Sequence, residues 1–426
     1  MNMQVLDTRR DASGGYKVDV SRGSHNGRVA SEWFSRPDDQ RYLSLDDLAR
    51  SVRGRSERSR TRIIESALIH VEANHRSRAG ETFTFAYDNL GRVTSKEVPT
   101  RSGLSTTHTR DVYYGYDLFG ALTYARFDST AGEGLNLTYN ALGQLTSSTQ
   151  SLDGITRTLG YQYDAAGRRT RITFPDAAYW QYQYDKLGRF TNLKDQLNRD
   201  LVLDAYYNFG IRYSHKREGS APDDTYYLDF AKRLTRTFTD HPTAGYDVNQ
   251  EWAYNPANQA VTESLDNQLF VWTGHPLNTS EVAYTSNGLN QIASGNSNAF
   301  TYDANGNLTF DGLTSFTYDT ENRLVTASGQ NNVALRYDPF GRLYEIDDGQ
   351  GGVRRLLYDG DALVAEYNTA GTMLDRYIHG VGAGDDPLLR YPGSSTSYLD
   401  AEYMVTDRLG SVIARYKRDG TAVAIN

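Results

Sequence analysis

The chain has 426 residues, 0 cysteines and a formal net charge of −8, which exclude a disulfide framework and thiolate metal sites and make the whole chain a poor nucleic-acid binder. Its 32 Tyr and 38 Gly residues favour strands and tight turns over helices. No run approaches the roughly 18 apolar residues that a membrane helix needs, so no membrane span is expected.

Residues 1–78 differ from the rest and are predicted to form a segment of loops and helices. The first ten residues have no apolar core and no cleavage pattern, so synthesis in the cytoplasm without a Sec signal is expected. Gly14-Gly15 and residues 21–24 indicate loops. A capping box predicts a short helix over residues 44–52, and an apolar stripe predicts a second helix over residues 60–73.

Five arginines between residues 53 and 62 leave two interpretations open. They could form a nucleic-acid patch or the solvated face of a helix, and the second is favoured because no stacking aromatic residues are interleaved. The residues are Arg53, Arg55, Arg58, Arg60 and Arg62.

From residue 82 onward one phrase returns: Tyr-Asp, two variable residues, Gly, then a polar residue, with alternating apolar and polar residues on both sides. This alternation around a short turn predicts one β-hairpin per copy. Asp can accept backbone N–H groups and Gly tolerates positive φ, so a type I turn with a bulge is expected. The phrases begin at Tyr87, Tyr116, Tyr139, Tyr163, Tyr184, Tyr302, Tyr318 and Tyr337. Spacings of roughly 20 to 30 residues indicate stacked units.

Between residues 200 and 285 the phrase decays but keeps its frame. Residues 228–234 lack both Tyr and Gly, and Asn258 stands where Gly is usual; Asn is the best non-glycine residue at positive φ. We expect Gly188 and Asn322 to have positive φ. Trp180, Trp252 and Trp272 are predicted to fill the core rather than to bind a ligand.

The ordered motifs of residues 289–324, followed by Arg376–Gly380 and Leu409–Val412, complete a pattern that resembles the YD repeats of Rhs proteins, toxin-complex C subunits and teneurins. The resemblance covers about residues 80–426. Residues 31–39 and 43–45 resemble the start of phage- and plasmid-related proteins of uncharacterised function, which would make the chain a chimera. The expected domains are 1–78, a YD-repeat array at 79–355, and a pre-core Rhs segment at 356–426.

In that family the repeats coil into a hollow β shell that encloses a C-terminal toxin, which is released by self-cleavage at an Asp-Pro core motif. The sequence ends at Asn426 before such a motif, so the toxin and the cleavage core are expected to be missing. Asp338-Pro339 lies inside a Tyr-Asp phrase and Asp386-Pro387 in the pre-core segment, and neither matches the cleavage site. No catalytic residue is carried over.

Other chemistry finds little support in the sequence. His70 and His75 are five residues apart, off the spacing that places two imidazoles on one ion. Asp303–Asn307 resembles the start of a calcium loop, but Thr314 stands where the bidentate Glu belongs. Ser411 lacks the flanking glycines of a nucleophile elbow. No catalytic, cofactor-binding or metal site is predicted, and the chain is expected not to be an enzyme.

We therefore predict a mainly β protein, a hairpin array coiling into a partial shell after a short helical N-terminal segment. Its implied role is encapsulation in a polymorphic toxin system, secreted or at the cell surface, with toxin cargo, neighbouring shell segments or a secretion-apparatus protein as partners. Two alternatives stay open: a cell-surface adhesion or carbohydrate-binding protein, and an inactive truncated gene product. About fifteen units allow about one turn around a cavity, so we expect an open wall with exposed edge strands at its C-terminal end.

Overall fold

The computed structural model describes residues 3–10, 16–22, 30–34, 73–270, 284–295, 298–329, 332–382, 386–407 and 410–425. The chain divides into two compact units, Met1–His70 and Val71–Asn426. The two predicted N-terminal helices lie outside the described residues, except that Ala73 begins a strand. Trp272 and the arginines at residues 53–62 also lie outside them.

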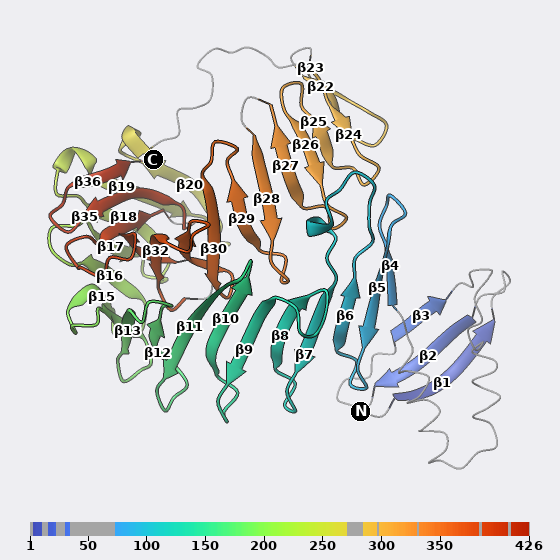
Figure 1. The fold of residues 1–426 in the computed structure, drawn as a ribbon. Coiled ribbons are helices and arrows are strands. Elements are labelled where there is room, and N and C mark those ends of the chain that lie inside the picture. Colours follow the sequence, from blue (N-terminus) through green and yellow to red (C-terminus); the bar gives the residue numbers. More distant parts are fainter. Residues whose placement is uncertain are drawn as a thin grey trace. The chain divides into compact units, whose positions relative to one another are not determined.

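The first unit contains a three-stranded antiparallel sheet, β1 (Met3–Arg10), β2 (Tyr16–Arg22) and β3 (Ala30–Phe34) (Figure 1). Ser21 and Arg22, expected in a loop, belong to β2 and pair with Gln4 and Met3 of β1. The loop expectation failed here because Ser and Arg have no strong preference of their own, and pairing with a neighbouring strand decided the conformation.

The second unit begins with a sheet of seventeen described strands, β4–β20, which we call the first sheet. Each strand pairs antiparallel with the next, and none of the described pairings joins β20 back to β4, so the sheet is open. The strands are β4 (Ala73–Arg76), β5 (Thr82–Tyr87), β6 (Val93–Glu97), β7 (Val112–Tyr116), β8 (Leu122–Phe127), β9 (Gly134–Tyr139), β10 (Leu145–Leu152), β11 (Ile155–Tyr163), β12 (Arg169–Thr173), β13 (Tyr179–Tyr184), β14 (Phe190–Lys194), β15 (Asp200–Tyr206), β16 (Arg212–Arg217), β17 (Asp223–Leu228), β18 (Leu234–Asp240), β19 (Val248–Tyr254) and β20 (Ala260–Leu265).

A small sheet of β21 (Tyr284–Ser286), β22 (Ile292–Gly295) and β23 (Asn298–Ala299) precedes a thirteen-stranded antiparallel sheet, which we call the second sheet. Its strands are β24 (Thr301–Tyr302), β25 (Leu308–Phe310), β26 (Ser315–Tyr318), β27 (Leu324–Ser328), β28 (Val333–Tyr337), β29 (Leu343–Asp347), β30 (Val353–Asp359), β31 (Ala362–Tyr367), β32 (Met373–His379), β33 (Pro387–Pro392), β34 (Glu402–Thr406), β35 (Val412–Lys417) and β36 (Ala422–Ile425). The proposed boundary at residue 355 falls inside β30, so the sheet continues across it.

Short 3₁₀ helices are the helical elements among the described residues: η1 (Thr106–His108), η2 (Ala244–Tyr246) and η3 (Gln268–Phe270). In the part of the chain that the structure describes, no helix has the length and apolar character needed to cross a membrane. The fold is therefore mainly β, as the hairpin pattern predicted.

The hairpins give each sheet two different edges. We call the edge with the Tyr-Asp turns the turn rim and the opposite edge the loop rim. In the first sheet the turn rim comprises residues 88–92, 117–121, 140–144, 164–168, 185–189, 207–211, 229–233 and 255–259. In Figure 1 the turns joining β7 to β8 and β9 to β10 lie along one margin of the sheet, and β28 and β29 lie beyond the other.

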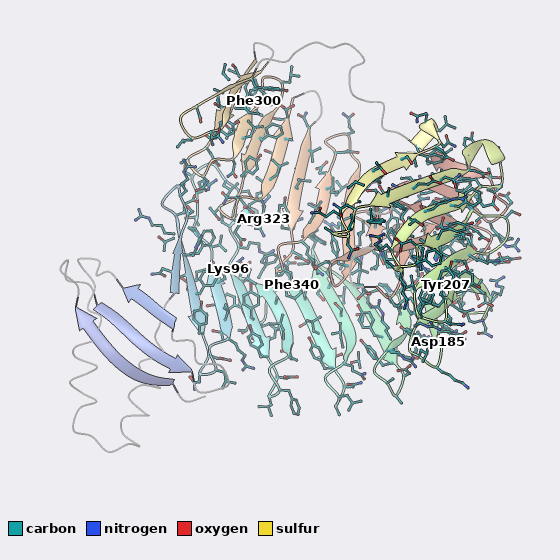
Figure 2. All side chains as sticks on the ribbon, turned by 180° about the vertical axis from the view of Figure 1, so that it is seen from behind. Lys96, Asp185, Tyr207, Phe300, Arg323 and Phe340 are labelled. Carbon is teal, nitrogen blue, oxygen red and sulfur yellow. The ribbon has the colours of Figure 1, made fainter. Side chains whose placement is uncertain are left out.

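One large core joins the middle strands of the first sheet, β11–β15, to the later strands of the second sheet. From the first sheet it takes Leu159, Ile172, Trp180 and Leu193; from the second, Leu357, Ile378, Leu389 and Tyr403. The Trp180 and Tyr391 ring centroids are 5.2 Å apart, and Trp180 is buried, as is Trp252. Side chains crowd this part of the unit (Figure 2). The C-terminal strands thus pack against the first sheet instead of extending the wall freely, because their inward faces are apolar and each buried Leu or Ile side chain stabilises by about 1.5–3 kcal/mol.

Candidate functional site

Each Tyr-Asp turn is closed by its own aspartate. In the turn after β13, Asp185 Oδ1 accepts the backbone N–H groups of Leu187 at 2.9 Å and Arg189 at 3.0 Å. Its Oδ2 accepts from Nε of Arg189 at 2.7 Å. Hydrogen bonds from the Arg189 backbone, aided by its guanidinium, hold the pKa of Asp185 below its ordinary value. Gly188 has φ +83° and Asn322 has φ +64°, which confirms both predictions.

The same residues connect each repeat to the next. The hydroxyl of Tyr184 donates to the carbonyl of Arg169 at 2.7 Å, and the Arg168 guanidinium lies 4.7 Å from the centre of the Tyr184 ring. Equivalent hydroxyl-to-carbonyl bonds are made by Tyr116, Tyr139, Tyr163, Tyr254, Tyr302, Tyr337 and Tyr358. The Tyr-Asp phrase is therefore a repeated clamp between neighbouring hairpins. Where the preceding turn ends in arginine, as before Tyr116, Tyr184 and Tyr337, the guanidinium also covers the tyrosine ring.

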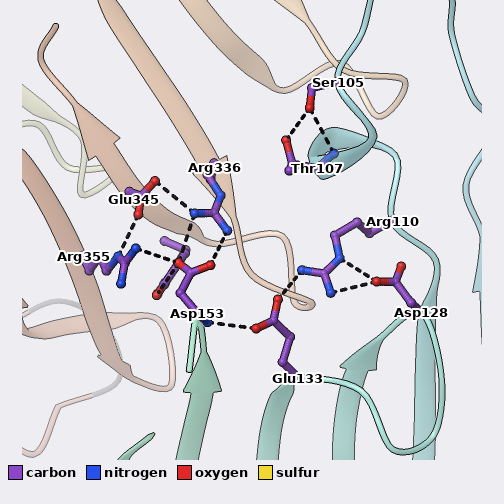
Figure 3. A network of polar contacts seen from close by, with 10 residues as sticks. Ser105, Thr107, Arg110, Asp128, Glu133, Asp153, Arg336, Glu345 and Arg355 are labelled. Atoms are coloured by element: carbon purple, nitrogen blue, oxygen red, sulfur yellow. Dashed lines mark hydrogen bonds and ion pairs between the residues drawn. The ribbon is translucent and has the colours of Figure 1, made fainter. Parts of the chain in front are cut away.

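A polar network joins the loop rim of the first sheet to the second sheet (Figure 3). Asp153, between β10 and β11, accepts from Arg336 at 2.9 and 3.0 Å and from the Tyr344 hydroxyl at 3.1 Å. Arg355 pairs with it at 3.0 Å. Burial works against the charged form of Asp153, but the hydrogen bond and charge of Arg336 outweigh it, so the pKa of Asp153 lies below its ordinary value.

Further contacts extend this seam in both directions. Towards β4, Lys96 Nζ pairs with Glu321 Oε1 at 2.6 Å, and Arg101 donates to the Tyr318 carbonyl at 3.0 Å. Lys96 and Arg323 lie on facing parts of the two sheets (Figure 2). Towards β36, Arg376 pairs with Asp176. The turn rim of the second sheet thus rests on the loop rim of the first over β24–β29, and the later strands pack inward.

A buried polar row crosses β15 to β18. Asp204, His215, Asp224 and Thr239 are neighbours in register on successive strands and all are buried. Asp204 Oδ1 lies 2.6 Å from His215 Nδ1, and Asp224 Oδ2 lies 2.9 Å from Arg217. Burial disfavours the charged form of Asp224, but the charge of Arg217 outweighs it and the pKa of Asp224 is lowered. Sequence reasoning missed this row because its residues come from four separate strands.

Two carboxylates, Glu366 and Asp375, stand directly opposite each other on β31 and β32 and are both buried. Burial raises the pKa of Asp375; Arg390 works against that shift, and the charge of Glu366 adds to it. Such a pair can serve acid–base catalysis. Here Glu366 is bound by Arg354 and by the Tyr377 hydroxyl, both at 2.8 Å, and Asp375 by Arg390. The pair is tied into an ion-pair ladder rather than presented to a substrate.

The two Asp-Pro pairs occupy different settings. Asp338 is buried and closes its Tyr-Asp turn by pairing with Arg342 at 2.7 Å. Asp386 lies in the connection before β33, where its carbonyl accepts the N–H of Gly380 at 2.8 Å. His70 lies outside the described residues, so the His70–His75 pair stays untested. Among the residues that are described, no group of three or more His, Asp or Glu is arranged to hold a metal ion.

Comparison with protein families gives two matches. The model described as RHS Repeat matches residues 139–179 and 163–195, and the Teneurin YD-shell model matches residues 225–425. Among curated relatives, the tRNA3(Ser)-specific nuclease WapA of Bacillus spizizenii is 27% identical over 169 residues, which cover 37% of this chain and 7% of that protein. The tRNA nuclease WapA of Bacillus subtilis is 28% identical over 141 residues, 31% and 6% of the two chains. The chain thus spans less than a tenth of these relatives.

Solved structures with a similar course of the chain come from toxin complexes. The match to the crystal structure of TcdB2-TccC3 covers 82% of this chain and 24% of the matched chain, with 14% sequence identity and a TM-score of 0.49. The Tc holotoxin pore of Photorhabdus luminescens covers 83% and 23%, with 13% identity and a TM-score of 0.49.

Proposed function

We propose that this chain, whose residues 139–195 and 225–425 place it in the Rhs and YD-repeat family, is a wall segment of a protein shell that encloses a toxin cargo. The observation that carries the proposal is the seam, where the turn rim of the second sheet rests on the loop rim of the first. Because the second sheet rests on the rim of the sheet that precedes it in the chain, successive parts of the array can stack into a continuous wall. The mechanism is steric: a closed β surface separates the cargo from its surroundings and leaves few free strand edges.

The use of the polar residues supports a structural role without catalysis. The aspartate of each described Tyr-Asp turn accepts backbone N–H groups of its own turn. Where an arginine stands four residues later, as at Arg92 and Arg168, the carboxylate also accepts from that side chain. The same arrangement in successive repeats builds the wall and leaves these groups committed to it. Self-cleavage by this chain is not part of the proposal.

The carbohydrate-binding alternative requires tyrosine rings that are free to stack on sugars. Where the preceding turn ends in arginine, the tyrosine ring is instead covered by it: guanidinium carbons lie 4.5 Å from the Tyr116 ring centre, 4.9 Å from that of Tyr254 and 4.7 Å from that of Tyr337. Their hydroxyls are bound to carbonyls of the preceding repeat. This arrangement favours the wall over an adhesion surface.

The partners of such a wall are a toxin domain and neighbouring shell segments, and a secretion-apparatus protein is a further candidate. The family relationship supports a place outside the cell or at its surface. An inactive gene product remains the competing explanation, and it predicts no effect on any cargo.

The test is to fuse a small tRNA-cleaving nuclease domain behind Asn426 and to compare its tRNA cleavage with that of the same domain on an unrelated soluble carrier. We expect slower cleavage in the wall fusion because the wall limits access of a large substrate. Replacing Asp153 by Asn, which weakens the seam, should restore part of the rate. Equal rates in both fusions would contradict encapsulation.

A further inference from the structure

The turn rim of the first sheet presents a row of exposed apolar side chains. Leu118 and Phe119 are 101% and 93% exposed, and they occupy the two variable positions of one Tyr-Asp turn. The row consists of Leu90, Leu118, Phe119, Leu142, Leu187, Phe209 and Phe230. At about 100 Å² each, these side chains present roughly 700 Å² of surface, close to the ~800 Å² that one partner contributes to a standard interface.

The same rim is covered in the second sheet. Thr320 holds the turn position that Leu118 holds in the first sheet, yet it is 1% exposed, and Pro339 at that position of the next turn is also buried. The cover is the loop rim of the first sheet, through Lys96 on Glu321 and Arg101 on the carbonyl of Tyr318. The molecule itself therefore shows what fits against a turn rim: the loop rim of another sheet of the same repeat.

The second sheet carries a loop rim of its own. Its connections include residues 311–314 and 348–352, and Leu313 there is 63% exposed. This rim bears Asp311 and Asp348. On the turn rim of the first sheet four of the five aspartates are paired with the arginine four residues later, so Lys186 and Lys232 outnumber the remaining carboxylate, Asp117. The two rims are therefore complementary in charge as well as in the kind of contact they make.

We propose that the turn rim of the first sheet docks the loop rim of the second sheet of another copy of this chain. The contact joins two different surfaces, so it is heterologous and repeats from one copy to the next. This proposal rests on the proposed function only because both invoke the same contact of a turn rim with a loop rim. Loss of self-association would leave protection of a fused nuclease unchanged, so the two proposals fail separately.

Light scattering of the full chain over a concentration series tests this. The wild-type chain should assemble as concentration rises. A turn-rim variant, L118S with F119S and L142S, should need at least about tenfold higher concentration, since exposed apolar anchors carry most of such a contact. A loop-rim variant, L313K, removes the exposed leucine and places a positive charge opposite Lys186 and Lys232, so it should lose assembly to the same degree. The replaced side chains are exposed, so an unchanged circular dichroism spectrum is expected for both.

The decisive sample is the mixture of the two variants. Each retains one intact rim, so the mixture should form a one-to-one dimer although neither variant assembles alone. The control L197S removes an exposed leucine from the same turn position, but on the loop rim of the first sheet, and should assemble like the wild type. A wild-type chain that stays monomeric, a mixture that does not dimerise, or a control that also loses assembly would each overturn the proposal.

Discussion

Replacing Asp153 by Asn should weaken the seam between the two sheets by about 2 kcal/mol. Arg336 donates to both carboxylate oxygens, and Arg355 and Tyr344 approach at 3.0 and 3.1 Å. Hydrogen bonds to a charged group contribute about 1.5–3 kcal/mol each, reduced here by solvent because the carboxylate is 22% exposed. The amide keeps one acceptor oxygen but turns an NH₂ group towards a guanidinium. Urea denaturation measures the loss.

The matched control is Asp128→Asn. Asp128 belongs to the same network (Figure 3) and has φ +60°, close to the +52° of Asp153, so Asn suits both turns equally. Its carboxylate is 57% exposed, and its single partner Arg110 lies at 2.8 Å. A surface pair of this kind contributes about 0–1 kcal/mol. If the two variants lose the same stability, the central role of Asp153 in the seam is wrong.

The pH dependence gives a second reading of the same variant. The folded pKa of Asp153 is lowered from 3.8, so the contribution of its charge is complete above about pH 4 and is lost as the pH falls through the folded pKa. The stability difference between the wild type and Asp153→Asn should therefore shrink below pH 4. A difference that stays constant down to pH 2 would show that the carboxylate charge is not its source.

Three further predictions concern the turns, a buried histidine and catalysis. Gly188→Val should cost more than about 1 kcal/mol, because φ +83° strains a β-branched residue, whereas Asn322→Gly should be nearly neutral; urea midpoints decide. Burial lowers the pKa of His241 to about 4, so the wild type should lose stability as the pH falls from 6.5 towards 4, and His241→Phe should remove this loss in thermal melts. The purified chain should remain one band of 47.8 kDa on long incubation; stable fragments whose formation an Asp substitution blocks would show an enzyme.

The hairpins and their turns could be predicted because the residues that shape each turn lie within the turn itself. Asp185 and Gly188 are three residues apart, so their roles follow from the phrase itself. The turn of residues 195–199 was missed although Asp195 binds Leu197 and Arg199 in the same way at 2.9 Å. Lys194 stands where the phrase has Tyr, and Asn198 where it has Gly, so the residues of this turn do not match the repeated phrase.

The seam and the core could not be predicted, because their partners are far apart in the chain. Asp153 meets Arg336 across 183 residues, and Trp180 meets Tyr391 across 211. No local pattern marks either residue for that contact. The length of the ribbon predicted an open wall with exposed edge strands at its C-terminal end. It did not reveal that β30–β36 turn their apolar faces onto the first sheet.

The seam also fixes which hairpin of the second sheet meets which hairpin of the first. Its partners are separated by about half the chain: 225 residues for Lys96 and Glu321, 200 for Gln196 and Thr396, and 183 for Asp153 and Arg336. One added residue in a loop-rim connection, such as residues 98–111, leaves the pairing of the neighbouring strands unchanged. One added hairpin between β10 and β30 would shift every later residue of the second sheet by one hairpin relative to its seam partner in the first sheet, so the contacts would be lost. The length of the loop-rim connections can therefore change without moving the seam, whereas a change in the number of hairpins requires matching changes on both sides of the seam.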